Sequence, residues 1–271
     1  MRLISLGAGV QSSVLALMAE RGVIPKVDGA IFSDTQSEPA SVYSWLDRLE
    51  EMVSFPIYRV TAGSLIKDET RIRVSGKSGK KYLKGSIPAF VLNPDGGKGL
   101  LGRKCTTDYK VIPIQREVKR LAGVKRSAGK VLASVLIGIS WDEVRRMKHS
   151  RVPYIVNEWP LIDMRMTRTG CLDWMKKNGY PVPPRSSCLM CPFHSDEEWS
   201  RLKSEEPLEF ARAVEFERQM HIAQKEQDTL RGVPYLHASC QPIDTVDFSA
   251  GKAGMQQLDM FENDCEGLCG V

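Results

Sequence analysis

Short apolar runs alternate with amphipathic stretches along much of the chain. Residues 14–19 and the stretch that includes Trp45 and Leu49 have the periodicity of helices. Four runs are short, apolar and typical of strands: residues 3–6, 30–33, 56–60 and 131–138. Strands that alternate with helices indicate a parallel sheet covered on both faces. We therefore predict an α/β fold with a doubly wound parallel sheet.

Two regions depart from this alternation. Residues 61–104 are rich in Gly and Lys, and we expect a long functional loop or a small insertion there. Ser195 and Glu198 have the spacing of a capping box, which predicts that a charged helical region begins there and runs to about residue 231. We thus divide the chain into an α/β domain (1–195, with the basic insertion 61–104), a helical extension (196–240) and a C-terminal tail (241–271).

Charge is concentrated in the insertion. The chain has a net charge of +5, and the stretch from Arg71 to Lys104 has nine Lys and Arg residues but only one acid, Asp95. Such a stretch favours an anionic partner, either a nucleotide or a nucleic acid, although a solvated loop has the same composition. No apolar run approaches the roughly 20 residues that span a bilayer. The N-terminal apolar run is too short for a secretory signal, so we expect a cytoplasmic protein without a membrane partner.

Candidate ligand-binding residues follow the predicted strands. Gly7 and Gly9 come directly after the first strand, and Ser12 and Ser13 open the following helix. Glycines permit close approach of the backbone, and a helix N-terminus binds phosphate, although a simple tight turn would have the same sequence. Asp34 and residue 138 also fall at carboxyl ends of strands, where ligands bind in parallel sheets.

The seven cysteines suggest metal or redox chemistry, because disulfides are rare in the cytoplasm. Cys188 and Cys191 form a C-x-x-C pair whose spacing fits a redox pair, a zinc site or an iron–sulfur site. Cys171 and Cys240 stand alone, and we expect both to be buried core thiols.

In five places, and in the same order, the chain resembles the phosphoadenosine-phosphosulfate (PAPS) and adenosine-phosphosulfate (APS) reductase family of the PP-loop superfamily. The similar stretches are Gly7-Ala8-Gly9-Val10-Gln11-Ser12 (S-G-G-x-D-S in the superfamily), Phe32-Ser33-Asp34-Thr35-Gln36-Ser37-Glu38, Cys105-Thr106-Thr107-Asp108-Tyr109-Lys110, Gly138-Ile139-Ser140-Trp141-Asp142-Glu143-Val144-Arg145, and Pro160-Leu161-Ile162-Asp163 with the later Cys188-x-x-Cys191. Together they cover about residues 1–195.

The resemblance implies an adenine-nucleotide site and a [4Fe–4S] cluster. The implied cluster ligands are Cys105, Cys188 and Cys191. The implied nucleotide-binding residues are Ser5, Gly7, Ala8, Gly9, Gln11, Ser12, Ser13, Asp34, Thr35, Gly138, Glu143 and Arg145. A mobile tail cysteine, here Cys265 or Cys269, would attack the sulfur of APS or PAPS, and a thioredoxin-like reductant would then release sulfite.

Three departures from the family pattern leave alternatives open. Thr106 replaces the second cysteine of a tandem pair, so the fourth iron would be held by Cys265, by Cys269, by a small ligand or by nothing. Gln11 replaces an Asp, and because a neutral amide is a poorer Mg²⁺ ligand than a carboxylate, use of Mg²⁺ stays open. Ser140 replaces an Arg, so recognition of the sulfonucleotide also stays open.

Two other functions are compatible with these residues. The first is ATP-dependent sulfur insertion into nucleic acid, as in tRNA thiolation or DNA phosphorothioation. An open cluster iron would supply the sulfur, and the stretch from Arg71 to Lys104 would bind the tRNA or DNA. The second is a non-catalytic nucleotide-binding module stabilised by zinc.

Overall fold

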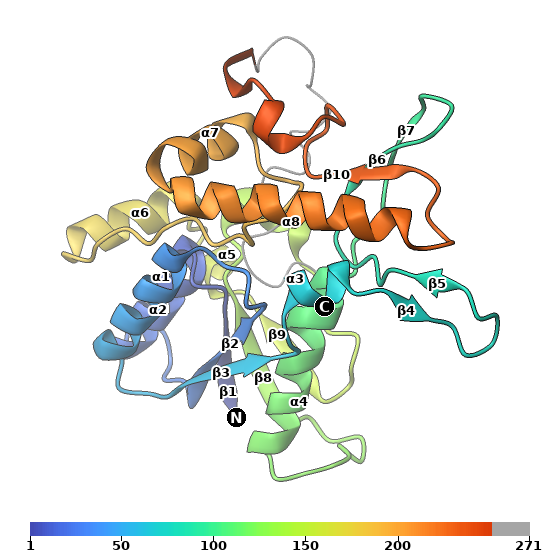
Figure 1. Ribbon diagram of the computed structural model, residues 1–271. Helices are drawn as coiled ribbons and strands as arrows, with labels where there is room; N and C mark the ends of the chain where they lie inside the picture. Colours follow the sequence, from blue (N-terminus) through green and yellow to red (C-terminus); the bar gives the residue numbers. More distant parts are fainter. Residues whose placement is uncertain (251–271) are drawn as a thin grey trace. The chain divides into compact units, whose positions relative to one another are not determined.

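The computed structural model describes residues 1–250, and these residues form two compact units (Figure 1). The first unit contains residues 1–62 and 106–187. The second contains residues 63–105 and the described chain from residue 188 onward. Each unit therefore combines two separate stretches of the sequence.

A five-stranded parallel sheet forms the centre of the first unit, in the order β3-β2-β1-β8-β9. Its strands are β1 (Arg2–Leu6), β2 (Gly29–Asp34), β3 (Ile57–Thr61), β8 (Ala133–Ile137) and β9 (Ile155–Glu158). The chain begins in the middle, extends the sheet in one direction to β3, and then extends it in the other through β8 and β9. The four predicted strands and the α/β fold class are confirmed. The direction reverses between β1 and β8, and ligands bind at this kind of position in open α/β sheets.

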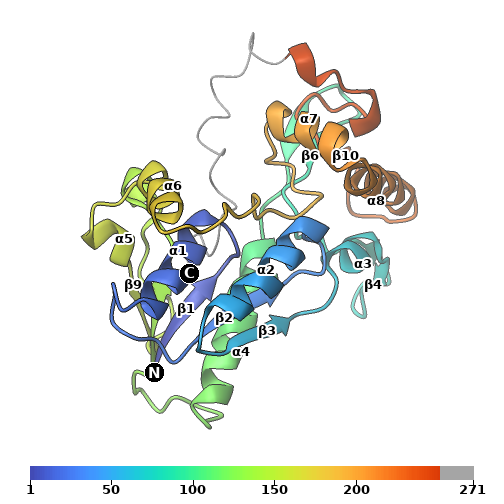
Figure 2. The ribbon, with the colours of Figure 1, turned by 90° about the vertical axis from the view of Figure 1, so that its left-hand side faces the viewer.

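Helices cover both faces of this sheet (Figures 1 and 2). Leu6, Phe32 and Leu136 pack on one face with α1 (Val10–Glu20), α2 (Ala40–Met52) and α6 (Arg168–Lys177). Ile31 and Val135 point to the other face, against α4 (Ile112–Leu121). Side chains alternate between the faces of a strand, so a strand covered on both sides is apolar at nearly every position. This explains why the strands were recognisable as short apolar runs.

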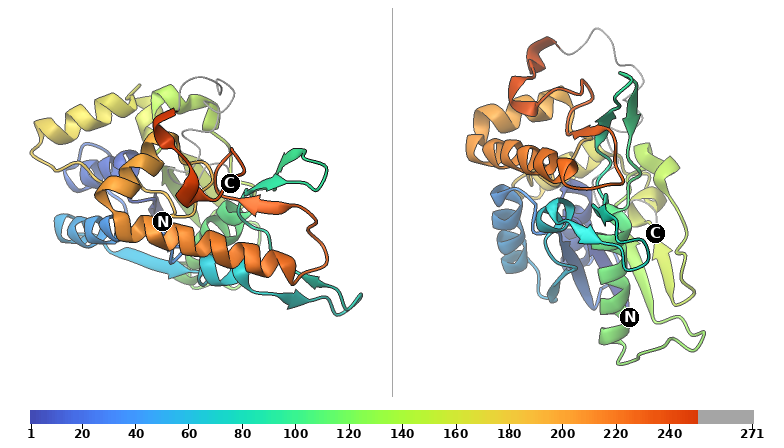
Figure 3. Two further views of the ribbon diagram at one scale, coloured as in Figure 1. Left: turned by 45° about the horizontal axis from the view of Figure 1, so that its top comes forward. Right: turned by 45° about the vertical axis from the view of Figure 1, so that its right-hand side comes forward.

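The second unit joins the basic segment to the later part of the chain. Residues 61–104 were expected to be a loop or an insertion, and they contain α3 (Leu65–Thr70), β4 (Arg73–Val74), β5 (Lys81–Tyr82), β6 (Phe90–Leu92) and β7 (Lys98–Leu100). Strand β10 (Val233–Tyr235) pairs with β6, with Pro234 opposite Val91, and completes an antiparallel sheet in the order β10-β6-β7. Figure 3 shows these strands as thin ribbons beside α8.

The predicted helical region after Ser195 is two helices, α7 (Asp196–Glu205) and α8 (Pro207–Lys225). Pro207 separates them, because the residue before a proline is disfavoured in the helical conformation. Two short 3₁₀ turns follow, η3 (Ile243–Thr245) and η4 (Phe248–Ala250). Among the described residues, no helix has the length and apolarity needed to cross a bilayer.

Candidate nucleotide site

The turn between β1 and α1 opens the candidate site. Ala8 has a positive φ of 59°, and Gly9 caps α1 in an extended conformation without a side-chain cap. The Gly7 N–H donates to Ser12 Oγ at 3.2 Å, which holds the turn against the first turn of the helix. That first turn contains no acidic residue. Because the first N–H groups of a helix have no intrahelical acceptor and carry partial positive charge, this turn can receive an anion.

Several predicted nucleotide-binding residues build the frame of this turn. A Cβ atom added at Gly138 would lie 2.7 Å from the Ser12 N atom, so the end of β8 and the start of α1 approach each other too closely for any side chain. Trp45 Nε1 donates to Ser13 Oγ at 2.9 Å, and Ser13 is fully buried. Ser5 is also buried, inside β1. These three residues therefore pack around the β1–α1 turn and support its shape.

A buried polar network surrounds Gln11. Its Nε2 atom donates to Glu143 Oε2 at 3.1 Å and lies 3.4 Å from Ser140 Oγ. Arg168, at the start of α6, donates from Nη1 to Gln11 Oε1 at 3.0 Å. Glu143 also forms an ion pair with Arg146. Both polar atoms of the Gln11 amide are thus used, one by a carboxylate and one by a guanidinium.

Arg168 is a residue that the sequence did not suggest. It lies 157 positions from Gln11 along the chain, and no motif marks it. The predicted Arg145 is exposed, whereas its neighbour Arg146 makes the ion pair with Glu143. Ser140 stands where the reductase pattern has an Arg. Arg168, from another helix, supplies a guanidinium beside Gln11.

The end of β2 provides a second group of polar residues. Asp34 accepts the Gln36 N–H at 2.7 Å and the Tyr43 hydroxyl at 2.8 Å. Burial, and then the hydrogen bond to Asp34, raise the pKa of Tyr43 well above its ordinary value, so Tyr43 remains a donor. Thr35 donates to the buried Glu38 carboxylate at 3.5 Å. Because β1, β2 and β8 are parallel neighbours, these residues lie on the same edge of the sheet as Gly7 and Gly138.

Lys110 adds a cation near this edge. Its Nζ atom lies 3.8 Å from Glu38 Oε1, and the Lys110 side chain is 16% exposed. Lys110 ends the third of the five stretches that resemble the reductase family, and the structure places it beside the carboxylate of Glu38.

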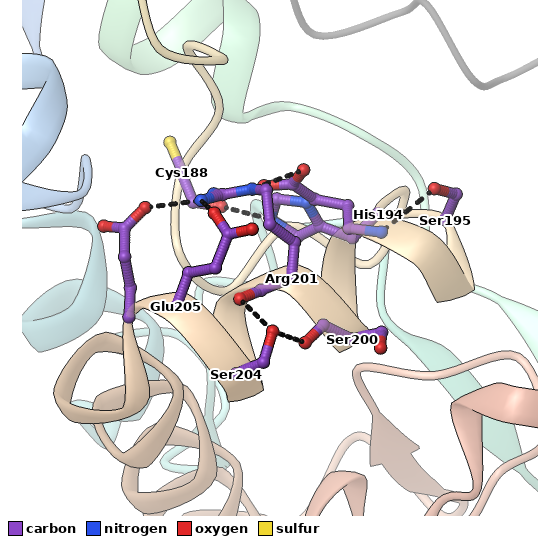
Figure 4. Close-up of polar contacts among 9 residues, drawn as sticks. Cys188, His194, Ser195, Ser200, Arg201, Ser204 and Glu205 are labelled. Carbon is purple, nitrogen blue, oxygen red and sulfur yellow. Dashed lines mark hydrogen bonds and ion pairs between the residues drawn. The ribbon is translucent and has the colours of Figure 1, made fainter.

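The three predicted cluster ligands belong to the second unit. Cys191 donates its N–H to the Cys188 carbonyl at 2.9 Å, which closes the C-x-x-C segment into a turn. His194 Nε2 donates to the same carbonyl at 2.9 Å, and Figure 4 shows the Cys188 sulfur directed away from the His194 ring. Cys191 is buried and Cys188 is partly exposed.

The described residues include no assembled site for the predicted [4Fe–4S] cluster. Within residues 1–250, no group of three or more His, Cys, Asp or Glu side chains is placed to hold a metal ion. Cluster ligation by Cys105, Cys188 and Cys191 therefore stays a prediction, which the iron content of anaerobically purified protein would test. Cys265 and Cys269, the predicted nucleophiles or fourth ligands, lie outside the described residues.

The other two described cysteines are core thiols, as expected. Cys171 packs fully buried among the side chains between α1, α6 and the sheet, and burial raises the pKa of its thiol to about 12. Cys240 is 6% exposed, and burial raises the pKa of its thiol as well. Neither thiol is suited to nucleophilic chemistry at neutral pH, because the thiolate is the reactive form.

Comparison with solved structures gives a similarity in fold at low sequence identity. No protein-family model and no curated protein matches the chain. Among solved structures, the chain is similar to phosphoadenylyl-sulfate (PAPS) reductase from Candida auris in a phosphate complex, at 17% sequence identity and a TM-score of 0.44. The similarity covers 67% of this chain and 74% of that chain. A similarity at this level carries no information about the reaction, so functional arguments depend on the residues themselves.

Proposed function

We propose that the protein is an adenine-nucleotide enzyme of sulfur metabolism with sulfonucleotide reductase activity on APS or PAPS. The proposal rests on two supports. The first is the order of the five sequence stretches that resemble the reductase family. The second is the β1–α1 turn, which lies at the point where the sheet changes direction and offers helix N–H groups to an anion.

The environment of Gln11 is the observation that favours reduction over ATP cleavage. Cleavage of ATP needs a divalent cation at the phosphates, and Mg²⁺ prefers carboxylate ligands. Here Gln11 stands where the superfamily pattern has an Asp. Its neutral amide oxygen already accepts a hydrogen bond from the Arg168 guanidinium at 3.0 Å. A fixed guanidinium repels Mg²⁺ and attracts phosphate or sulfate oxygens. Attack on a sulfonucleotide requires such anion recognition and does not require a metal at this position.

The proposed reaction has two steps. A tail thiolate, from Cys265 or Cys269, attacks the sulfur of the sulfonucleotide, the bond between sulfur and the phosphate oxygen breaks, and the nucleoside phosphate leaves with the bonding electron pair. The enzyme then carries an S-sulfocysteine. One thiolate of a dithiol reductant attacks the cysteine sulfur and releases sulfite, which leaves a mixed disulfide between enzyme and reductant. The second thiolate of the reductant then displaces the enzyme thiolate. The reductant ends as a disulfide and has supplied the two electrons.

An anaerobic assay with each sulfonucleotide tests this proposal. APS and PAPS are supplied separately with thioredoxin and dithiothreitol, and sulfite is quantified. The proposal predicts sulfite from at least one of the two, and loss of sulfite when Cys265 and Cys269 are both replaced by Ser. Absence of sulfite, together with release of pyrophosphate from ATP and Mg²⁺, would instead support the sulfur-insertion alternative.

A further inference from the structure

The excess of positive over negative charge in the protein comes from one part of the second unit. Residues 63–105 contain ten Lys and Arg residues and three acids. The whole chain contains 38 Lys and Arg and 33 Asp and Glu, so the remainder has 28 basic and 30 acidic residues. The net charge of +5 therefore arises entirely from this segment. A field that is concentrated in this way attracts a large anion more strongly than an even distribution would.

The three acidic residues of the segment make polar contacts with other residues of the same segment. Asp68 forms an ion pair with Arg73 at 2.8 Å. Glu69 is buried and accepts the Ser86 N–H at 2.9 Å with both oxygens. Asp95 accepts the Gly97 N–H at 2.9 Å. These contacts are made with Arg73 and with backbone N–H groups, and not with Lys77, Lys80 or Lys81.

The lysines are presented by a small β-ribbon, which we define as residues 73–82. Strands β4 and β5 pair antiparallel, and the Ser75 N–H donates to the Lys80 carbonyl at 2.9 Å to close the connecting turn. The turn contains Gly79 at a φ of 67°, which a residue with a side chain rarely adopts. Lys77, Lys80 and Lys81 are all exposed on this ribbon. The Asp228 carboxylate accepts the Lys81 N–H at 2.7 Å and ties the ribbon to the body of the second unit.

We infer that the β-ribbon of residues 73–82 binds the phosphate backbone of double-stranded DNA. A two-stranded ribbon fits the major groove of a duplex, and lysines at its turn are placed to contact the phosphates on either side. Binding of a single strand commonly uses exposed aromatic side chains that stack on bases. Residues 63–105 contain only two aromatic residues, Tyr82 and Phe90, and both are only partly exposed. This surface goes beyond the proposed function, because reduction of a sulfonucleotide does not require a nucleic acid.

Fluorescence anisotropy with a labelled 20-base-pair DNA duplex of arbitrary sequence tests the inference. The test variant is K77A/K80A/K81A. The matched control is K125A/R126A/K130A, which removes the same charge from exposed residues of the first unit. We expect at least a tenfold weaker Kd for the test variant and less than a threefold change for the control. The slope of log Kobs against log salt concentration should also be less negative for the test variant. The slope should change by up to about 2.7 if all three lysines contact phosphates.

Three results would overturn the inference: no binding by the wild-type protein at low salt, equal losses in both variants, or binding of the unpaired strand as tight as binding of the duplex. Circular dichroism melting verifies that both variants are folded. Sulfite production from APS or PAPS serves as a separate readout, and we expect it to be unchanged in both variants. Failure of the nucleic-acid inference and failure of the reductase proposal are therefore distinguishable.

Discussion

At the scale of single residues, we propose that Arg168, which contacts Gln11, recognises the anionic part of the nucleotide. Replacement of Arg168 by Gln removes the guanidinium beside the β1–α1 turn. A hydrogen bond to a charged group contributes about 1.5–3 kcal/mol, so we expect APS or PAPS to bind roughly 10- to 150-fold more weakly. Titration calorimetry measures this change. Arg165→Gln removes an exposed cation nearby and should change the Kd less than threefold; an equal effect of both variants would mean that only net charge matters.

Gly138 should tolerate no side chain. In Gly138→Ala, the new Cβ atom would lie 2.7 Å from the Ser12 N atom and 3.0 Å from the Gln11 carbonyl carbon, and these backbone atoms cannot rotate away. We expect a loss of about 1–3 kcal/mol in the free energy of unfolding, measured with urea. Gly102→Ala is the control, because a Cβ atom there meets nothing within 4 Å. A similar stability for the two variants would contradict the close approach of β8 and α1.

The Cys171 thiol should be inert in the native protein. Burial raises its pKa from 9.0 to about 12, so almost none of it is thiolate at pH 8. Iodoacetamide at pH 8 followed by peptide mass spectrometry should leave Cys171 unmodified in the native protein and modify it in urea. Since the folded pKa is the higher one, the stability linked to this thiol is complete below about pH 9 and is lost as the pH rises toward 12. Rapid labelling of Cys171 in native protein would contradict its burial.

At the scale of elements, the start of α7 depends on one side chain. Ser195 Oγ accepts the Glu198 N–H at 3.3 Å, as the predicted capping box requires. The Glu198 carboxylate forms an ion pair with Arg201 at 2.8 Å. Ser195→Ala should lower the free energy of unfolding by about 1 kcal/mol. Ser200→Ala, at an exposed position of α7, should leave it within about 0.5 kcal/mol, and a reversed order would show that Ser195 is not the cap.

The elements differ in how well the sequence predicted them. Strands β1, β2 and β8 are buried at nearly every position, and such strands produce short apolar runs that are recognisable without any other information. Strand β3 lies at the edge of the sheet and is only partly buried, and its sequence, IYRVT, is less apolar. Strands β4 and β5 have two residues each, and a strand of two residues has no periodicity to recognise. Strand β10 pairs with β6 more than 140 residues away, so its position depends on tertiary contact.

At the scale of the whole molecule, the candidate residues divide between the two units. The predicted nucleotide-binding residues all belong to the first unit, and Cys105, Cys188 and Cys191 belong to the second. The order of the strands places Gly7, Asp34 and Gly138 at one edge of the sheet, and this could be predicted from the alternation of strands and helices. The role of Arg168 could not, because it depends on the packing of α6 against α1.

Calorimetric titration of the wild-type protein with APS and PAPS in the presence of EDTA is the most direct test of the proposed anion recognition. We propose that the β1–α1 turn and Arg168 recognise the anionic nucleotide without a divalent cation. We therefore expect binding of at least one sulfonucleotide with a Kd below about 1 mM when Mg²⁺ is removed. Absence of binding in EDTA, with recovery of binding only for ATP when Mg²⁺ is added, would contradict it.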